Sequence, residues 1–180
     1  MSPATATTFH PVLRVLHWSM AALIVSMLFI GVGMVSTAGP GYSWLLSLHR
    51  PLGIAILALA LIRLLVRARF STPALPADLP RWQASAARAS HLLLYAGMIA
   101  MPLIGWAMVS AAGKPVKLAE GLALPGILPR DLKLYAMLRE AHGILAYALF
   151  ALILLHLAAA LTHGLVRRDG VLASMLVGKS

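Results

Sequence analysis

Three histidines stand in one long apolar segment in the last quarter of the chain. The segment from Ala141 to Val166 contains no Asp, Glu, Lys or Arg, yet it includes His142, His156 and His163. Polar side chains are costly inside a bilayer, and those that occur there are usually functional. Imidazole is a common metal ligand and also exchanges protons near neutral pH. These histidines are therefore the first candidates for chemistry.

His142 and His156 have a spacing that suits two stacked sites. They are 14 residues apart, which in an α-helix is a rise of about 21 Å and nearly four complete turns. Both side chains would therefore lie on the same face of such a helix, one near each end. This is the spacing needed to ligate two cofactors, one in each leaflet of a membrane.

Four apolar runs predict the helices that would position these residues. A membrane-spanning helix needs about 20 mainly apolar residues. The runs are Trp18–Thr37, Tyr42–Val66, Ser90–Gly113 and Ala141–Val166, within spans of about 14–37, 42–67, 88–113 and 135–167. Only 11% of the 180 residues are charged, against about 25% in a soluble domain. We therefore expect a single all-α domain over residues 1–180, an integral membrane four-helix bundle.

The segments around these runs raise two further questions. Arg14 and the first apolar run have the order of a signal peptide, but the run is long and no clean A-x-A cleavage site follows it. We therefore expect a retained span. The connections between the runs are rich in Pro and Gly. The longest, over residues 113–131, has room for a short interfacial helix.

The basic residues predict how the chain is oriented. An even number of spans puts both termini on one side, and the Lys and Arg residues then divide unequally between the two sides. The terminal side has nine: Arg14, Arg63, Arg67, Arg69, Arg81, Arg88, Arg167, Arg168 and Lys179. The other side has six: Arg50, Lys114, Lys117, Arg130, Lys133 and Arg139. The positive-inside rule places the termini in the cytoplasm. The net charge of +10 is thus a membrane feature, and no basic run with interleaved aromatic residues suggests nucleic-acid binding.

Two further histidines can complete two pairs at matched depths. The first span runs from inside to outside with His17 at its inner end, and the second runs back with His49 at its outer end. We therefore expect His17 beside His156 at the inner level, and His49 beside His142 at the outer level. For each histidine taken singly, the alternative is a hydrogen bond between helices.

This ligand set favours haem over other metal sites. Zinc takes three or four protein ligands, and no carboxylate or thiolate is nearby to supply the remainder. The chain has no Cys, which excludes disulfides, thiolate metal sites, cysteine-ligated iron–sulfur clusters and the attachment of c-type haem. Haem iron takes two axial ligands, and its porphyrin packs among apolar side chains. Two bis-histidine b-type haems therefore fit best.

Small and basic residues near the histidines could complete such sites. Six glycines would let a flat macrocycle approach the backbone, or would equally serve ordinary helix packing; they are Gly31, Gly33, Gly53, Gly97, Gly105 and Gly143. Arg50 and Arg139 are near the outer pair, and Arg14 and Arg88 near the inner pair. We expect these arginines to bind haem propionates. The alternative is that they extend to the membrane interface.

The chain resembles the prokaryotic cytochrome b561 family along nearly its whole length. The matching stretches are RVLHW at Arg14–Trp18, LHRPLG at Leu48–Gly53, HLLLY at His91–Tyr95, MPLIGW at Met101–Trp106, EAHG at Glu140–Gly143 and HLAAALTHGLVRRDGVLASM at His156–Met175. No single stretch is decisive, but together and in this order they are specific. The resemblance places axial ligands at His17, His49, His142 and His156, the four that the spacing selects.

The resemblance implies a four-helix, di-haem b-type cytochrome of the bacterial inner membrane. Such proteins carry electrons between a quinone and a donor on the other side. Some members resemble superoxide oxidases, which pass an electron from periplasmic superoxide to ubiquinone. Related b-type subunits anchor hydrogenases and formate dehydrogenases. The implied cofactors are two haem b, with ubiquinone as the acceptor.

The three remaining histidines have other predicted roles. His163 lies two turns after His156 and should reach the inner interface, where a quinone needs hydrogen bonds and protons. The alternative is an exposed or capping histidine at a helix end. His91 begins the third span at similar depth and could be a propionate or packing partner. We expect His10 to be an ordinary loop residue.

The outer connection is more basic than the positive-inside rule predicts. Its cations outnumber its acids, Glu120, Asp131 and Glu140; they are Lys114, Lys117, Arg130, Lys133 and Arg139. Contact with lipid headgroups is one explanation. The sharper hypothesis is an electrostatic funnel around Lys117, Arg130 and Lys133. It would steer a small anion such as superoxide, or an acidic redox protein, towards the outer haem.

Two functions remain open from the residues alone. One is a self-contained oxidoreductase that passes electrons from a small donor to quinone. The other is an electron carrier or haem-bearing anchor for a periplasmic dehydrogenase or hydrogenase. A transporter whose histidines relay protons is a third class, and the absence of carboxylates from the four apolar runs argues against it.

Overall fold

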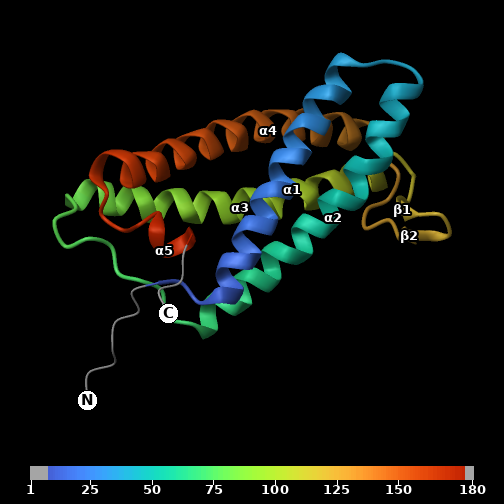
Figure 1. Ribbon diagram of the computed structural model, residues 1–180. Coiled ribbons are helices and arrows are strands. Elements are labelled where there is room, and N and C mark those ends of the chain that lie inside the picture. Colours follow the sequence, from blue (N-terminus) through green and yellow to red (C-terminus); the bar gives the residue numbers. More distant parts are fainter. Residues whose placement is uncertain (1–7, 177–180) are drawn as a thin grey trace.

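Four long helices account for most of the computed structural model, which describes residues 8–176 (Figure 1). The helices are α1 (Pro11–Ser36), α2 (Pro40–Arg69), α3 (Arg81–Ala111) and α4 (Leu132–Leu161), and α4 continues into a π-helical segment, η1 (Thr162–Arg167). By length and composition all four can cross a membrane. The expected all-α membrane four-helix bundle is confirmed. Lys179, counted above for orientation, lies outside the described residues.

Local sequence explains where the helices begin. Pro11 and Pro40 occupy the first helical positions of α1 and α2, where the missing N–H would have had no partner in any case. Asp131 caps α4, because its side chain accepts hydrogen bonds from the amides of Lys133 and Leu134 at 2.9 and 3.0 Å. These three helices therefore begin before the apolar runs from which they were predicted.

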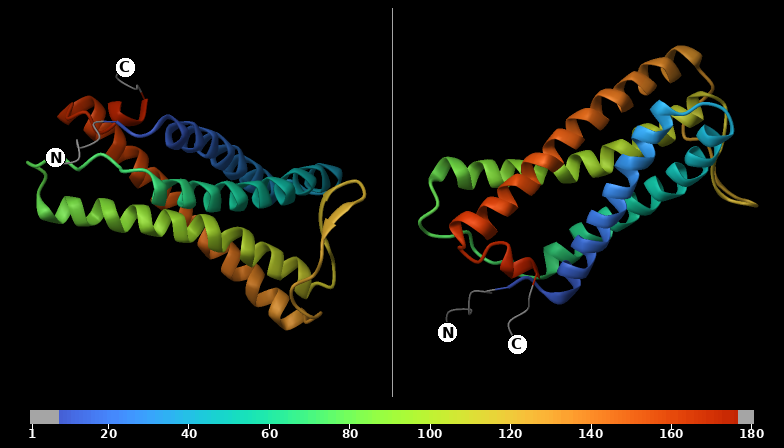
Figure 2. Two further views of the ribbon diagram at one scale, coloured as in Figure 1. Left: turned by 90° about the horizontal axis from the view of Figure 1, so that it is seen from below. Right: turned by 45° about the horizontal axis from the view of Figure 1, so that its top comes forward.

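The helices pack as two pairs that cross each other (Figure 2). α1 lies along α2, α3 lies along α4, and α2 joins the pairs by also packing on α3. A small core of Met20, Ala60 and Met98 lies between α1, α2 and α3. No residue of α4 is buried. α4 thus approaches α1 and α2, which carry His17 and His49, less closely than it approaches α3.

The two described ends of the chain meet at one end of the bundle. The amide of Phe9 donates to the carbonyl of Ser174 at 3.2 Å, and the indole N–H of Trp18 donates to the carbonyl of Met175 at 3.1 Å. The short helix α5 (Ala173–Leu176) lies here as well. We name this the inner end, following the orientation that the basic residues predict, and that orientation stays a prediction.

The opposite, outer end carries a β-hairpin and not the short helix considered above. Strands β1 (Val116–Ala119) and β2 (Leu122–Leu124) pair antiparallel, and β1 packs against α2. The short helix for which this connection has room is not formed. Gly121, with φ of +73°, makes the tight turn between the strands, a conformation that glycine adopts without strain. Pro125 follows β2 directly and cannot donate to a ladder or a helix.

Candidate haem sites

The outer pair of histidines comes together between α2 and α4. The ring centres of His49 and His142 are 6.1 Å apart, with the ring planes at 62°. Nδ1 of each ring is buried without a hydrogen bond of normal geometry, although His142 lies beside the Met101 carbonyl. A Cβ at Gly105 would stand 3.3 Å from Cε1 of His142. The absence of a side chain at Gly105 therefore lets the His142 ring lie close against α3.

The inner pair comes together between α1 and α4. The ring centres of His17 and His156 are 6.4 Å apart, with the ring planes at 72°. His91 of α3 joins them at this level, with its ring centre 5.3 Å from that of His156. Nδ1 of His91 lies 2.7 Å from the Ala87 carbonyl. Since a carbonyl only accepts, this nitrogen carries the proton, and His91 is held by its own helix.

Each pair has the spacing that one metal ion between two imidazoles requires. Two metal–imidazole bonds of about 2.0 Å, plus about 1.1 Å from each nitrogen to its ring centre, separate two ring centres by about 6.2 Å. The measured values are 6.1 and 6.4 Å. Within residues 8–176 no group of three or more His, Cys, Asp or Glu side chains could hold a metal ion. Each pair thus fits the two axial positions of haem iron better than the tetrahedral set of zinc.

The four arginines expected to bind propionates divide into two kinds. Nε of Arg14 and of Arg50 is buried with no hydrogen-bond partner. Arg14 precedes His17 by three residues and Arg50 adjoins His49, so each lies beside one histidine pair. Arg88 and Arg139 are exposed. Two of the four arginines, one at each level, therefore have a buried guanidinium nitrogen without a partner, and an anionic group of a haem could accept its hydrogen bond.

The family of the chain follows from its sequence match. A model of prokaryotic cytochrome b561 matches residues 8–178. The chain belongs to this family. Cytochrome b561 homolog 1 of Escherichia coli (strain K12) is 28% identical, over 89% of this chain and 92% of its own length. Cytochrome b561 homolog 2 of the same organism is 31% identical, over 91% and 88%. The probable superoxide oxidase CybB of Yersinia pestis is 30% identical, over 91% and 93%.

Membership of the cytochrome b561 family establishes the general chemistry. The chain is a multi-pass protein of the bacterial inner membrane, it binds b-type haem and it takes part in transmembrane electron transfer. The orphaned imidazole and guanidinium nitrogens described above fit such a group, since a haem supplies both a metal for imidazoles and carboxylates for arginines.

His163 lies at the inner end of this cytochrome, in the π-helical segment η1. Its Nδ1 lies 2.6 Å from Oδ2 of Asp169, which also accepts a bond from Nε of Arg167 at 3.0 Å. Arg167 in turn donates to Oδ2 of Asp78, in the α2–α3 connection, at 2.7 Å. The π-helix ends at Arg167, and the next residue, Arg168, has a φ of +51°. The chain turns back there, so that Asp169 faces His163.

The pKa of the Asp169 carboxyl lies below its usual value. Burial raises this pKa, but the hydrogen bonds from His163, Arg167 and the Val171 amide together lower it by more. Asp169 is therefore an anion that fixes the ring of His163. Sequence analysis missed Asp169, although it stands in the RRDG stretch that follows the fourth span. It also missed Asp78, the distant partner of Arg167, which carried no recognisable signal.

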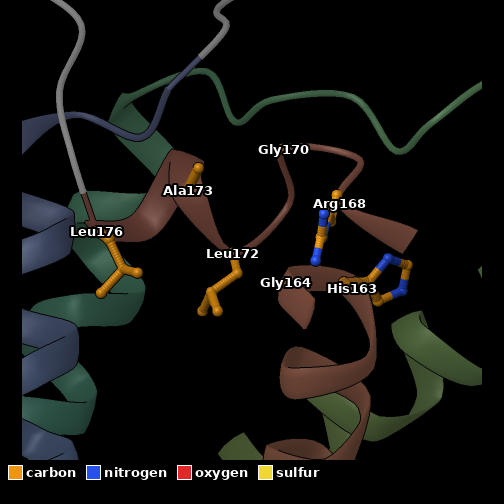
Figure 3. Close-up of a pocket in the computed structure, with 7 residues that line it drawn as sticks. All are labelled: His163, Gly164, Arg168, Gly170, Leu172, Ala173 and Leu176. Carbon is orange, nitrogen blue, oxygen red and sulfur yellow. The ribbon is translucent and has the colours of Figure 1, made fainter. Parts of the chain in front are cut away.

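A pocket of about 290 Å³ opens beside His163 (Figure 3). Its lining residues are His163, Gly164, Arg168, Gly170, Leu172, Ala173 and Leu176. Figure 3 shows His163 and Arg168 on one side, facing Leu172 and Leu176 across the opening. A side chain at Gly164 would collide with Leu172. The pocket thus combines an apolar wall with one hydrogen-bonding imidazole.

A second pocket, of about 360 Å³, lies at the outer end between α2 and β1. Its polar lining consists of Ser43, Ser47, Arg50, Lys117 and Glu120. The hairpin therefore places Lys117, one of the three cations of the expected funnel, in the same pocket as Arg50, which adjoins His49 in sequence.

The other two cations of the expected funnel lie at the ends of the outer connection. The aliphatic part of Arg130 packs over Gly113, which has a φ of +75°. Lys133 is exposed in the first turn of α4. In the described part of the chain, the ion pairs all involve Arg167 or His163 at the inner end. The outer cations are thus left unneutralised by ion pairs within these residues.

Two buried polar residues at the inner level were not among the expected site residues. Nε of Arg63 and the hydroxyl of Tyr95 are buried without a hydrogen-bond partner. A signal existed for Arg63, because it follows His49 by 14 residues, the same spacing that separates His142 from His156. Sequence analysis counted Arg63 only as a charge that sets orientation. His10, expected to be a loop residue, instead caps α1 and stacks on Phe70 at 3.8 Å.

Proposed function

We propose that this cytochrome holds two b haems and passes electrons across the inner membrane from a periplasmic donor, such as superoxide, to a membrane quinone. The observation that carries the proposal is the presence of two opposed histidine pairs at two depths. His49 and His142 would hold the outer haem, and His17 and His156 the inner one. Their ring centres are 6.1 and 6.4 Å apart.

The chain's own residues supply position and surroundings for one-electron chemistry. When bound, a haem provides a one-electron redox centre. α4 contributes a ligand to both pairs, so its 14-residue spacing fixes the vertical offset of the two sites at about 21 Å. Arg14 at the inner level and Arg50 at the outer level offer charge-assisted hydrogen bonds to carboxylates. The apolar side chains around them exclude water.

The outer pocket suits a small anionic donor. Arg50 and Lys117 line it together with one acid, Glu120, and Arg130 and Lys133 lie at the ends of the outer connection. An excess of positive charge at an opening raises the encounter rate of an anionic substrate. Superoxide gives up one electron and leaves as dioxygen, which carries no charge and is not held. The 30% identical relative named as a probable superoxide oxidase supports this choice of donor.

The inner pocket suits the ring of a quinone. Two electrons and two protons convert a quinone to a quinol, so two superoxide anions are needed for each quinone. His163 can form a hydrogen bond with a quinone oxygen, because Asp169 holds its Nδ1 and Nε2 is left for a ligand. Leu172 and Leu176 line the same pocket and provide the apolar surface that a quinone ring requires.

The first test is optical. A dithionite-reduced minus oxidised spectrum of the detergent-purified protein, with a pyridine haemochrome count, should show low-spin b-type bands and about two haems per chain. One haem would remove one of the histidine pairs from the proposal. No haem, after supplementation during expression, would overturn it.

The second candidate function is a haem-bearing anchor for a periplasmic dehydrogenase or hydrogenase. The positive outer surface with its hairpin would favour it, because the same field steers an acidic protein. Activity of the purified chain alone decides between the two. Superoxide-dependent reduction of a soluble quinone supports the self-contained oxidoreductase, whereas haem that superoxide cannot reduce supports the anchor.

A further inference from the structure

Two arginines of α2 face one tyrosine of α3 inside the bundle. The guanidinium carbons of Arg63 and Arg67 lie 5.7 and 5.9 Å from the ring centre of Tyr95. Neither the Nε of Arg63 nor the hydroxyl of Tyr95 has a hydrogen-bond partner, and both atoms are buried. Buried polar groups normally find a partner, so each unpaired group calls for a physical reason.

The depth of this cluster is that of the inner histidine pair. Arg63 lies 14 residues after His49 on α2, which puts it on the same face about 21 Å further in. Tyr95 lies one turn after His91, whose ring is 5.3 Å from that of His156. The Arg63 guanidinium is close enough to act electrostatically on the rings of His17 and His156. α1 and α4 thus provide the two imidazoles of the inner site, and α2 and α3 surround it with the arginines and the tyrosine.

The cluster has an excess of positive charge. Arg14, Arg63 and Arg67 belong to this level, and α1, α2 and α3 contain no Asp or Glu. The acidic groups nearest in the chain, Asp78 and Asp169, pair with Arg167. A cation–π contact compensates a desolvated guanidinium less fully than a carboxylate does. The arrangement therefore calls for an anion that the described residues do not supply.

We propose that Arg63, together with Arg67 and the Tyr95 hydroxyl, binds the carboxylate groups of the inner haem. This inference rests on the proposed function, in which His17 and His156 hold that haem. A b haem carries two propionates, and the planar fork of a guanidinium matches a carboxylate with two parallel hydrogen bonds. Arg63 and Arg67 are one helical turn apart and can share these two groups with Arg14. They take the role that sequence analysis gave to Arg88, which is exposed.

The arrangement has a consequence for the redox chemistry of the inner haem. Reduction removes one positive charge from the iron. A buried carboxylate that has lost its cation therefore stabilises the oxidised form relative to the reduced form. Replacing Arg63 by a neutral residue should therefore lower the affinity of the inner haem for an electron, by about tenfold in the reduction equilibrium. Tenfold corresponds to about 59 mV for one electron.

The experiment is a redox titration with a haem count on four proteins: parent, Arg63→Gln, Arg63→Lys and the matched control Arg69→Gln, which removes an exposed arginine from the same helix. The inner step is the one that His156→Ala abolishes. Arg63→Gln should lower that step by about 59 mV or lose the inner haem during purification. Arg63→Lys should change less, and Arg69→Gln should match the parent.

A second arm separates haem carboxylates from a lipid phosphate as the bound anion. Haem-free protein is loaded with haem or with its dimethyl ester, in parent and Arg63→Gln backgrounds. If Arg63 binds a propionate, esterification and Arg63→Gln each weaken retention of the inner haem, and their effects do not add. Fully additive losses would overturn the inference, as would an Arg63→Gln variant with unchanged haem count and potentials. Fewer than two haems per chain in the parent would contradict the proposed function itself. Two haems whose retention and potentials do not change on Arg63→Gln would contradict this inference alone.

Discussion

The two ends of the bundle handle charge in opposite ways. At the inner end, Asp78 and Asp169 are both engaged by Arg167, and Asp169 also holds His163. At the outer end, Asp131 is used to cap α4. Lys117 and Arg50 line an open pocket there. The inner end therefore uses its acids to fix structure, and the outer end leaves its positive charge available to solvent.

This difference indicates two kinds of substrate. A field of unneutralised cations acts at a distance and suits a small anion that arrives from water and leaves quickly. A network of hydrogen-bonded ion pairs acts only at contact range. It suits a ligand that must be held in one orientation, as a quinone must be while it receives protons. The number of cations alone would have suggested the reverse, since the sequence predicts nine for the inner side and six for the outer side.

The largest expected effect comes from removing one ligand at each level. His49→Ala should lose only the outer haem and His156→Ala only the inner one, because in the proposed function each histidine pair would hold one haem. A pyridine haemochrome count measures the loss, which should be half of the parent value. His10→Ala is the histidine control, and a His156→Ala variant with the parent's haem content would refute the pairing.

The next effect tests the open charge of the outer end. Replacing Lys117, Arg130 and Lys133 together by Gln should slow superoxide-driven haem reduction by about tenfold and flatten its salt dependence. The matched control neutralises three exposed inner-side cations, Arg69, Arg81 and Arg88. Stopped-flow reduction at several ionic strengths distinguishes the two triple variants. Equal rates in both would show that the outer field does not steer the donor.

The helices and the histidine pairing could be anticipated because both follow from local periodicity. Hydropathy finds the spans, and 14-residue spacing together with span direction selects which histidines meet. The inner-end network could not be anticipated, since Asp78 and Arg167 are 89 residues apart and their meeting depends on the turn after η1. The hairpin was missed because its strands are short and lie in a connection rich in Pro and Gly.

Arg63 shows a different kind of omission. Its spacing from His49 equals the spacing between His142 and His156 on α4. Sequence analysis nevertheless counted this arginine only as a charge that sets orientation. Arg88 and Arg139 were selected for nearness in sequence to the histidines, and both proved to be exposed. Helical phase does not separate them either, because Arg139 precedes His142 by three residues, as Arg14 precedes His17. The packing of the assembled helices decides which arginine is buried beside a site.

A smaller effect tests the locked charge of the inner end. Asp169→Asn keeps the size of the side chain but removes the charge that holds His163 and Arg167. We expect both haems to remain, and the KM for a soluble quinone to rise about fivefold while reduction of the haems by superoxide is unchanged. Asp78→Asn, which removes only the distant partner of Arg167, is the control. If Asp169→Asn changed superoxide-driven haem reduction instead, Asp169 would belong to the electron path and not to the quinone end.

The smallest effect concerns the pH dependence of stability. Because the pKa of Asp169 is lowered in the folded protein, its carboxylate stabilises the fold above the unfolded-state value near pH 4. That contribution disappears as the pH falls through the lower, folded-state pKa. The midpoint of thermal unfolding of the parent should therefore exceed that of Asp169→Asn by about 2 °C at pH 6, and the two should converge below pH 4. The matched control is the outer Asp131→Asn variant, which removes an acid from the other end of the bundle but keeps a side chain that can cap α4. A difference between parent and Asp169→Asn that persisted unchanged in acid would mean that packing, and not charge, holds the inner end together.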